Sequence, residues 1–522
     1  MFFCPFLVQH GKMIDRFVIY TLCTVSAYTA YRIMRKYSKK RNKKLNAPSQ
    51  TKDGRRLSRR ISFTSASMAM GAFPPQSNMA QPIINGVLYF APNDCPSDDE
   101  LMEVVRTMLQ FERCAGVPVG TMGGNDWRFR ECSDVNEGSL VRVLEFEGGE
   151  EELLRLVEEH MQDDLREGRG DLPWWELLVL KNAGSGRSAV VFRIEHCLAD
   201  GLSLVTLFES LVSYADGSPM EEGGLIPSSM NRKFQQKKAG RLSLFYKSLK
   251  STLKVLTLPS SKFDDGVAFR NGIGGDMCYS GKRKAVIFNT VSLDFIKSLK
   301  NAAGVSINDV FLACFSQAVR DYNLHENCPV MKSKGKNVQF RALMPLAFPR
   351  PREEARDRSL TLRNKWVFVS SKMGLGIENI VDRLRYVNNE LTKQKKSPEA
   401  FCQLKVQESI PPKLPLKLAR QTVYDLFTRH SVVFANVPGP PKECTFARRS
   451  VVEVQILFNN LIPQVEILSY MDRVFMNLVL DSEAVPHCEL IPIFFSRALV
   501  SLAKEFKVDV PANVSEHAEK VI

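Results

Sequence analysis

Histidine is scarce in this 522-residue chain, which has only seven, and the twelve cysteines include no C-x-x-C pair. Scattered cysteines favour reduced thiols over a disulfide framework or a zinc site. The sequence also lacks a G-x-S-x-G elbow, a Walker A segment and the H-E-x-x-H and H-x-x-E-H motifs. These absences disfavour a serine hydrolase, a P-loop enzyme and a zinc protease, and we predict no metal.

Excess positive charge is confined to one end of the chain. Residues 1–60 contain 15 of the 71 Lys and Arg residues and only two acidic residues, so the other 462 residues are nearly neutral. A nucleic-acid enzyme would carry a basic surface on its folded body. We therefore predict no nucleic-acid partner and a targeting or anchoring device at the N-terminus.

The N-terminal segment combines an apolar run with basic flanks. Residues 17–31 carry no charge, and eight Lys and Arg residues follow within residues 32–44. We predict a hydrophobic membrane anchor at residues 1–34 with the body in the cytosol, while an interfacial helix or a cleaved targeting peptide remain alternatives. Residues 35–81 are rich in Ser, Lys, Arg and Pro, which predicts a basic flexible linker. Ser58 and Ser62 follow paired arginines and resemble kinase sites, although a solvated linker is the simpler interpretation.

The rest of the chain alternates between strand-like and helix-like segments without internal repeats, which predicts a mixed α/β (α+β) fold. A stretch rich in Gly, Ser, Pro and charge at 217–238 interrupts the pattern. We predict an N-terminal lobe at 82–238, an amphipathic crossover at 239–282, a C-terminal lobe at 283–510 and a tail at 511–522. Expected strands include 141–146, 175–181, 188–195, 340–344, 366–370, 431–435, 466–470 and 474–480, and expected helices include 150–164, 293–303, 307–321 and a closing helix within 492–506.

An amphipathic helix is expected within the crossover, at 241–258. Helical spacing places apolar residues on one face and lysines on the other; the apolar residues are Leu242, Phe245, Leu249, Leu253 and Leu256. We favour packing of this apolar face on the core. The alternative is a helix that docks on a lipid surface and admits lipid substrates.

His196 is the best candidate for chemistry among the histidines. Strand alternation places it on one face with Val190, Phe192 and Ile194, at the end of an apolar strand. An imidazole held there is partly desolvated and near neutral in pKa, as a general base requires, although a packed core histidine is an open alternative. Asp200 is placed to stabilise the turn, to cap the next helix or to pair with a buried arginine.

The segment from His196 to Gly201, with Asp200 between them, resembles the HxxxDG signature of the chloramphenicol acetyltransferase-like superfamily. Three further segments resemble the PLWE, ND and NVPGP motifs of the wax ester synthase/diacylglycerol acyltransferase family; they are Pro173-Trp174-Trp175-Glu176, Asn308-Asp309-Val310 and Asn436-Val437-Pro438-Gly439-Pro440. Together the motifs cover roughly residues 85–505, and the chain is identified as a member of that family. Glu195 occupies the position where the family often has a first histidine. Trp174 replaces the usual leucine, and its larger side chain would narrow the acyl-accepting tunnel expected for the family.

The resemblance implies two chloramphenicol acetyltransferase-like lobes with a tunnel between them. It implies transfer of a fatty acyl group from acyl-CoA, a co-substrate and not a cofactor, to diacylglycerol or a long-chain alcohol. It also implies that His196 is the catalytic base, and supporting roles in fixing the loop, the lobe interface and the return turn are expected for Pro173, Trp175, Asp200, Gly201, Asn308, Asp309, Asn436 and Gly439. A membrane surface is the expected partner, at the endoplasmic reticulum or a lipid droplet.

Two other functions stay open. The first is a lipid-binding protein on a degenerate acyltransferase fold, for which Glu195 is the only support. The second is an acyltransferase that acts on a sterol or a secondary metabolite.

Overall fold

The computed structural model describes residues 48–51, 53–70, 81–120, 126–220, 225, 241–270, 272–348 and 351–521. The predicted anchor at 1–34 lies outside these residues. Among the described helices, none is by itself both long and apolar enough to cross a membrane. Only α8 (Leu293–Ala303) and α9 (Ile307–His325) taken together meet that criterion, and they are bent by 94° at the break between them.

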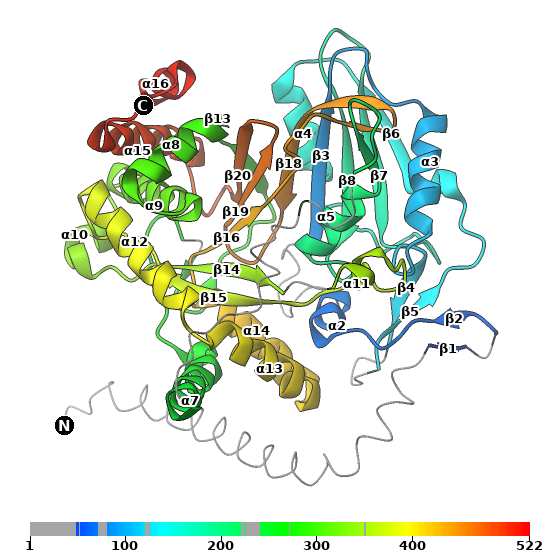
Figure 1. Ribbon diagram of the computed structural model, residues 1–522, viewed down its shortest axis with the longest axis horizontal. Helices are drawn as coiled ribbons and strands as arrows, with labels where there is room; N and C mark the ends of the chain where they lie inside the picture. The colour runs from blue at the N-terminus through cyan, green and yellow to red at the C-terminus, as the bar shows by residue number, and fades with distance from the viewer. Residues whose placement is uncertain are drawn as a thin grey trace.

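The first lobe is built on a seven-stranded sheet with helices on both faces (Figure 1). Its strand order is β6 (Val141–Phe146), β7 (Trp175–Asn182), β8 (Ser188–Glu195), β3 (Ile83–Phe90), β18 (Arg449–Phe458), β17 (Cys444–Phe446) and β9 (Val212–Tyr214). Alternate residues of β7 and β8 face opposite sides, as strand geometry requires. Leu177 and Val190 therefore belong to the core shared with α3 (Asp98–Leu109), whereas Leu178 and Val191 pack with α4 (Glu150–His160).

The second lobe has its own seven-stranded sheet. The order is β12 (Arg283–Ile287), β20 (Arg473–Asp481), β19 (Gln464–Tyr470), β16 (Val432–Val437), β14 (Arg341–Ala347) and β15 (Trp366–Lys372), with β13 (Val291–Ser292) also paired to β20. Its core includes residues of α8, α9, α12 (Ile380–Lys395) and α15 (Ile491–Phe506). The predicted tail contains α16 (Ala512–Ala518), in which Val514 is fully buried in the same core.

Two strands from the second half of the sequence belong to the sheet of the first lobe. β17 and β18 come from the second half of the sequence, yet they complete the sheet of the first lobe, and β18 pairs with β3 as far as Phe458 opposite Ile84. The predicted boundaries at 82–238 and 283–510 therefore do not separate the two sheets. Sequence periodicity cannot reveal such a pairing, because the partners are more than 350 residues apart.

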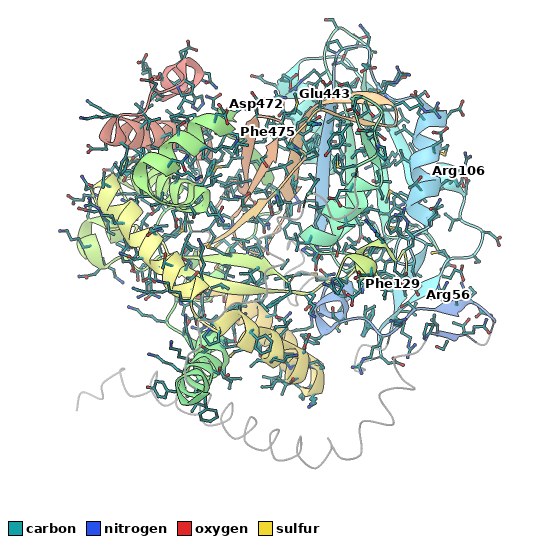
Figure 2. All side chains as sticks on the ribbon, in the orientation of Figure 1. Arg56, Arg106, Phe129, Glu443, Asp472 and Phe475 are labelled. Atoms are coloured by element: carbon teal, nitrogen blue, oxygen red, sulfur yellow. The ribbon has the colours of Figure 1, made fainter. Side chains whose placement is uncertain are left out.

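The predicted flexible linker is wrong for its described part. β2 (Arg56–Leu57) pairs with β1 (Ser49–Gln50) and with β5 (Arg128–Glu131), and Figure 2 shows Arg56 and Phe129 at this lower edge of the first lobe. α2 (Phe63–Ala69) follows and buries Ala66 and Ala69 in the lobe core. The basic composition of 35–81 concealed these few apolar residues.

The two serines considered as kinase sites belong to this folded segment. Ser58 is buried, and its hydroxyl accepts a hydrogen bond from the Phe129 backbone N–H at 2.9 Å. Ser62 caps α2 by accepting from the Ser65 N–H. Neither serine stands in a solvated linker.

α7 (Arg241–Thr257) forms where the sequence predicts it, but the favoured orientation is wrong. Phe245, Leu249 and Leu253 are 69%, 48% and 55% exposed. The helix instead contacts the segment at α13 (Glu399–Ser409) through small and polar groups: the Ser251 hydroxyl lies 3.4 Å from that of Ser397, and the Lys254 ammonium forms an ion pair with Glu399. Its apolar face therefore points away from the core.

Candidate active site

A large cavity lies between the two lobes. Its volume is about 1010 Å³, and its walls come from both sheets, from α2, from α5 (Gly201–Glu209) and from the helices α13 and α14 (Leu416–Thr428). Most of the lining side chains are apolar, and His196 is among the few that titrate. The predicted meeting place of the lobes therefore contains the predicted base.

His196 is fixed at the point where β8 ends. Its backbone N–H donates to the Pro82 carbonyl at 2.8 Å, and its ring centroid lies 5.4 Å from that of Phe458 and 5.8 Å from that of Trp366. The side chain is half-buried, and Nδ1 is buried without a hydrogen-bond partner in the described part of the chain. Nε2 is thus the ring nitrogen left to face the cavity.

The electrostatic surroundings keep this imidazole neutral. Burial lowers the pKa of His196 below its ordinary value, since desolvation disfavours the charged ring, while its own backbone carbonyl and the Asp200 carboxylate oppose this effect. A neutral imidazole accepts a proton, so the group is in its basic form at neutral pH.

Asp200 holds the loop behind His196, whereas Gly201 shows no steric need for glycine. The Asp200 carboxylate caps α5 by accepting from the Ser203 N–H at 2.8 Å, and its other oxygen accepts from the Lys365 N–H at 2.8 Å. Of the roles considered for Asp200, the structure therefore supports capping and loop fixation. Gly201 begins α5, and a Cβ there would lie 4.0 Å from the nearest atom, Val437 Cγ2, so the position has room for a side chain.

Asn364 is a brace that the sequence did not reveal. Its Nδ2 donates to the His196 carbonyl at 2.7 Å and to the Ser65 hydroxyl at 3.0 Å, and its Oδ1 accepts from the Trp366 indole at 3.2 Å. The loop of His196 is thereby tied to α2 and to the strand β15 of the other lobe. Asn364 lies just before the expected strand at 366–370, and nothing else in the neighbouring sequence indicates its role.

The ND and NVPGP segments meet at the cavity wall. Asn436 Nδ2 donates to Asn308 Oδ1 at 2.6 Å, and both residues line the cavity. Asp309 is fully buried and forms a capping box with Ser306 at the start of α9. Gly439 is sterically required, because a Cβ there would lie 2.1 Å from the Ser469 carbonyl oxygen.

The Pro173 segment supports the site from outside the cavity. Trp175 is fully buried at the start of β7, its indole donates to the Cys114 carbonyl at 2.8 Å, and its backbone N–H donates to Pro173. Trp174 does not narrow the cavity, since it is not a lining residue and the Arg166 guanidinium lies 4.8 Å from its ring. Glu195 is buried in an ion pair with the same Arg166 at 2.7 Å and is likewise outside the cavity.

Two family models match the chain in order along its length. The catalytic-domain model of the wax ester synthase/diacylglycerol acyltransferase family matches residues 99–270, and the C-terminal-domain model of that family matches residues 363–503. Together they cover more than half of the sequence. The chain belongs to the wax ester synthase/diacylglycerol acyltransferase family.

One curated relative of this family member is a Mycobacterium tuberculosis protein named probable diacylglycerol O-acyltransferase tgs2. It is 26% identical over 269 residues, which span 47% of this chain and 56% of the relative. The match therefore spans about half the length of that relative.

Two solved structures show the fold. The wax ester synthase/diacylglycerol acyltransferase of Marinobacter aquaeolei VT8 aligns with a TM-score of 0.56 and 16% identity, over 86% of this chain and 99% of that one. The first condensation domain of the CDA synthetase aligns with a TM-score of 0.55 and 13% identity, over 87% and 97%. The predicted two-lobed, chloramphenicol acetyltransferase-like fold is confirmed.

The cavity also contains a cluster of polar side chains that the sequence did not predict. Asn459, Asn460, Gln464 and Glu466 line it together with His196. Burial raises the pKa of Glu466 to about 7, with only a hydrogen bond from Gln464 opposing the effect. The available signal was a single acidic residue between the apolar residues Val465 and Ile467 of β19.

The described residues contain no group of three His, Cys, Asp or Glu side chains placed to hold a metal ion. No disulfide joins the ten described cysteines. Burial raises the pKa of the Cys197 thiol, so this neighbour of His196 stays protonated and is a poor nucleophile. Within this part of the chain, His196 is the group best suited to the chemistry.

Proposed function

We propose that this protein is an O-acyltransferase that moves a fatty acyl group from acyl-CoA to a lipid hydroxyl. The acceptors are diacylglycerol, which gives triacylglycerol, and long-chain alcohols, which give wax esters. The observation that carries the proposal is the neutral imidazole of His196 facing a large, mainly apolar cavity between the lobes.

The reaction needs one base. His196 Nε2 takes the proton of the acceptor hydroxyl while its oxygen attacks the thioester carbonyl carbon. The carbon–sulfur bond then breaks, and the imidazolium returns the proton to the leaving CoA thiolate. The products are an ester and free CoA, with no covalent acyl-enzyme. The cavity volume lies at the upper end of the range for ligand pockets, which suits long acyl chains. As part of this proposal, acyl-CoA and the lipid acceptor enter the cavity by separate openings.

The degenerate lipid-binding alternative loses its support. Glu195 was the reason to consider it, and the ion pair with Arg166 gives this residue a structural role away from the cavity. A general base remains in place one residue later. A sterol or secondary-metabolite acceptor is retained as an outcome of the experiment below.

We also propose that the enzyme works at a lipid surface. Four large apolar or aromatic side chains of α7 are exposed: Phe245, Leu249 and Leu253 of its apolar face, and the neighbouring Tyr246. Lysines on the same helix complement anionic lipid headgroups. Val255 and Leu258, at the end of this helix and just beyond it, line the cavity, so a docked helix would connect the cavity to the lipid. The basic, apolar N-terminal sequence supports a location at the endoplasmic reticulum membrane or a lipid droplet, which a fluorescent fusion would test.

The experiment uses the full chain in membranes from a host that makes no neutral lipid. Labelled acyl-CoA is supplied with diacylglycerol, a long-chain alcohol or a sterol, and the products are separated by chromatography. We expect labelled triacylglycerol or wax ester from the unmodified chain, none above background from His196→Ala, and normal product from His325→Ala, which changes a partly exposed histidine outside the cavity. Product from the sterol alone, or lipid binding without product, would contradict the proposal.

A further inference from the structure

A cluster of polar side chains interrupts the apolar wall of the cavity in the loop after β18 and at the start of β19. Asn460 Nδ2 donates to Gln464 Oε1 at 2.6 Å, and Gln464 Nε2 donates to the Glu466 carboxyl. Asn459 is 1% exposed, and neither its amide nitrogen nor its oxygen has a hydrogen-bond partner among the described residues. Buried polar groups are almost always hydrogen-bonded, so these unpaired atoms indicate a missing partner.

The cluster is beside the proposed base. Asn459 directly follows Phe458, whose ring lies 5.4 Å from that of His196, and consecutive Cα atoms are about 3.8 Å apart. β18 and β8 pair with β3 on its two sides. Phe458 is the last paired residue of β18, and His196 directly follows the last paired residue of β8, so both lie where the two strands meet the same end of β3. His196 and Asn459 both line the cavity, so a molecule whose hydroxyl reaches His196 occupies the space that Asn459 borders.

The cluster offers both donors and acceptors. The Asn459 amide can donate and accept. Glu466 has no ion-pair partner in the described part of the chain, and with a pKa raised to about 7 by burial a large share of this carboxyl is protonated at neutral pH and can donate. Such a set matches ester carbonyl and ether oxygens close to a reacting hydroxyl.

We propose that Asn459 and Glu466 form a subsite for the ester groups of a diacylglycerol acceptor, and that this subsite favours diacylglycerol over a simple long-chain alcohol. A diacylglycerol carries ester oxygens within a few bonds of its free hydroxyl, whereas a fatty alcohol carries only methylenes there. A bound alcohol would leave the buried Asn459 amide unpaired and would give the Glu466 carboxyl no partner besides Gln464, which disfavours that complex.

This inference rests on the proposed acyltransferase function, and its test separates the two. Purified Asn459→Leu, Glu466→Leu and Glu466→Gln are assayed for kcat/KM with diacylglycerol and with a long-chain alcohol. We expect each leucine variant to lower the diacylglycerol-to-alcohol ratio about tenfold, the effect of losing one hydrogen bond. Glu466→Gln keeps a donor and should retain most of the ratio. Asn477→Leu, which removes a buried amide that does not line the cavity, should leave the ratio unchanged.

The possible results are distinct. Absence of activity with both acceptors in the unmodified chain overturns the proposed function. An unchanged ratio in folded Asn459→Leu and Glu466→Leu overturns the subsite, as does a rise in the KM for acyl-CoA that is equal with both acceptors, which would assign the cluster to the donor. If the leucine variants do not fold, an unchanged ratio in Asn459→Ala and Glu466→Ala overturns the subsite in the same way.

Discussion

Replacing Asp200 tests how the two lobes hold the active-site loop. The carboxylate is buried and accepts two backbone N–H bonds at 2.8 Å, from Ser203 at the start of α5 and from Lys365 on the segment that enters β15. Asp200→Ala removes both. Loss of a helix cap costs about 1 kcal/mol, and loss of a charge-assisted hydrogen bond to a buried donor costs about 1.5–3 kcal/mol. We expect a total destabilisation of about 2.5–4 kcal/mol.

The assay combines unfolding with a pH profile. We expect the urea midpoint of Asp200→Ala to fall clearly and that of Asp200→Asn to fall less because one acceptor oxygen remains. The midpoint of Asp509→Ala, which changes an exposed aspartate, should stay the same. The Asp200 charge favours protonated His196, so its removal should also move the acid limb of kcat to lower pH. Unchanged stability together with an unchanged pH profile would refute this account of the loop.

Three further predictions follow from the site and from α7. Because burial lowers the pKa of His196, the acid limb of kcat should have its midpoint below the ordinary imidazole pKa of about 6.5; a midpoint above pH 7 would contradict this. Replacing the apolar face of α7 with alanines should reduce binding to vesicles containing anionic lipid at least tenfold in a sedimentation assay, whereas Leu324→Ala, at another exposed apolar position, should not. Gly439→Ala should destabilise the chain by about 1–3 kcal/mol in urea unfolding, because the new Cβ would overlap the Ser469 carbonyl; wild-type stability would show that the turn moves freely.

Local sequence pattern was enough to predict the strand that ends before His196 and two helices of the second lobe. The strand at 188–195 and the helices at 293–303 and 307–321 depend on neighbouring residues, and the structure has β8, α8 and α9 at these positions. The spacing of His196 and Asp200 likewise indicated a strand end followed by a turn, with capping of the next helix as one of three roles considered for Asp200. Those features could be read from a few adjacent residues.

Features that depend on distant partners could not be predicted. β18 belongs to the first lobe only because it pairs with β3, and Asn364 matters only because it reaches the carbonyl of His196. The exposure of α7 depends on which face the rest of the fold leaves uncovered. Glu466 has the sequence context of an ordinary strand residue, and only the fold shows that it lines the same cavity as the base.

The most direct test of the central claim is the rate of acyl transfer by His196→Ala at saturating acyl-CoA and acceptor. General base catalysis typically contributes about 10²- to 10⁴-fold. The account predicts a fall in kcat of that size in a variant whose circular dichroism spectrum and urea midpoint match those of the unmodified chain. A folded variant that retains kcat within threefold would contradict the assignment of His196 as the base.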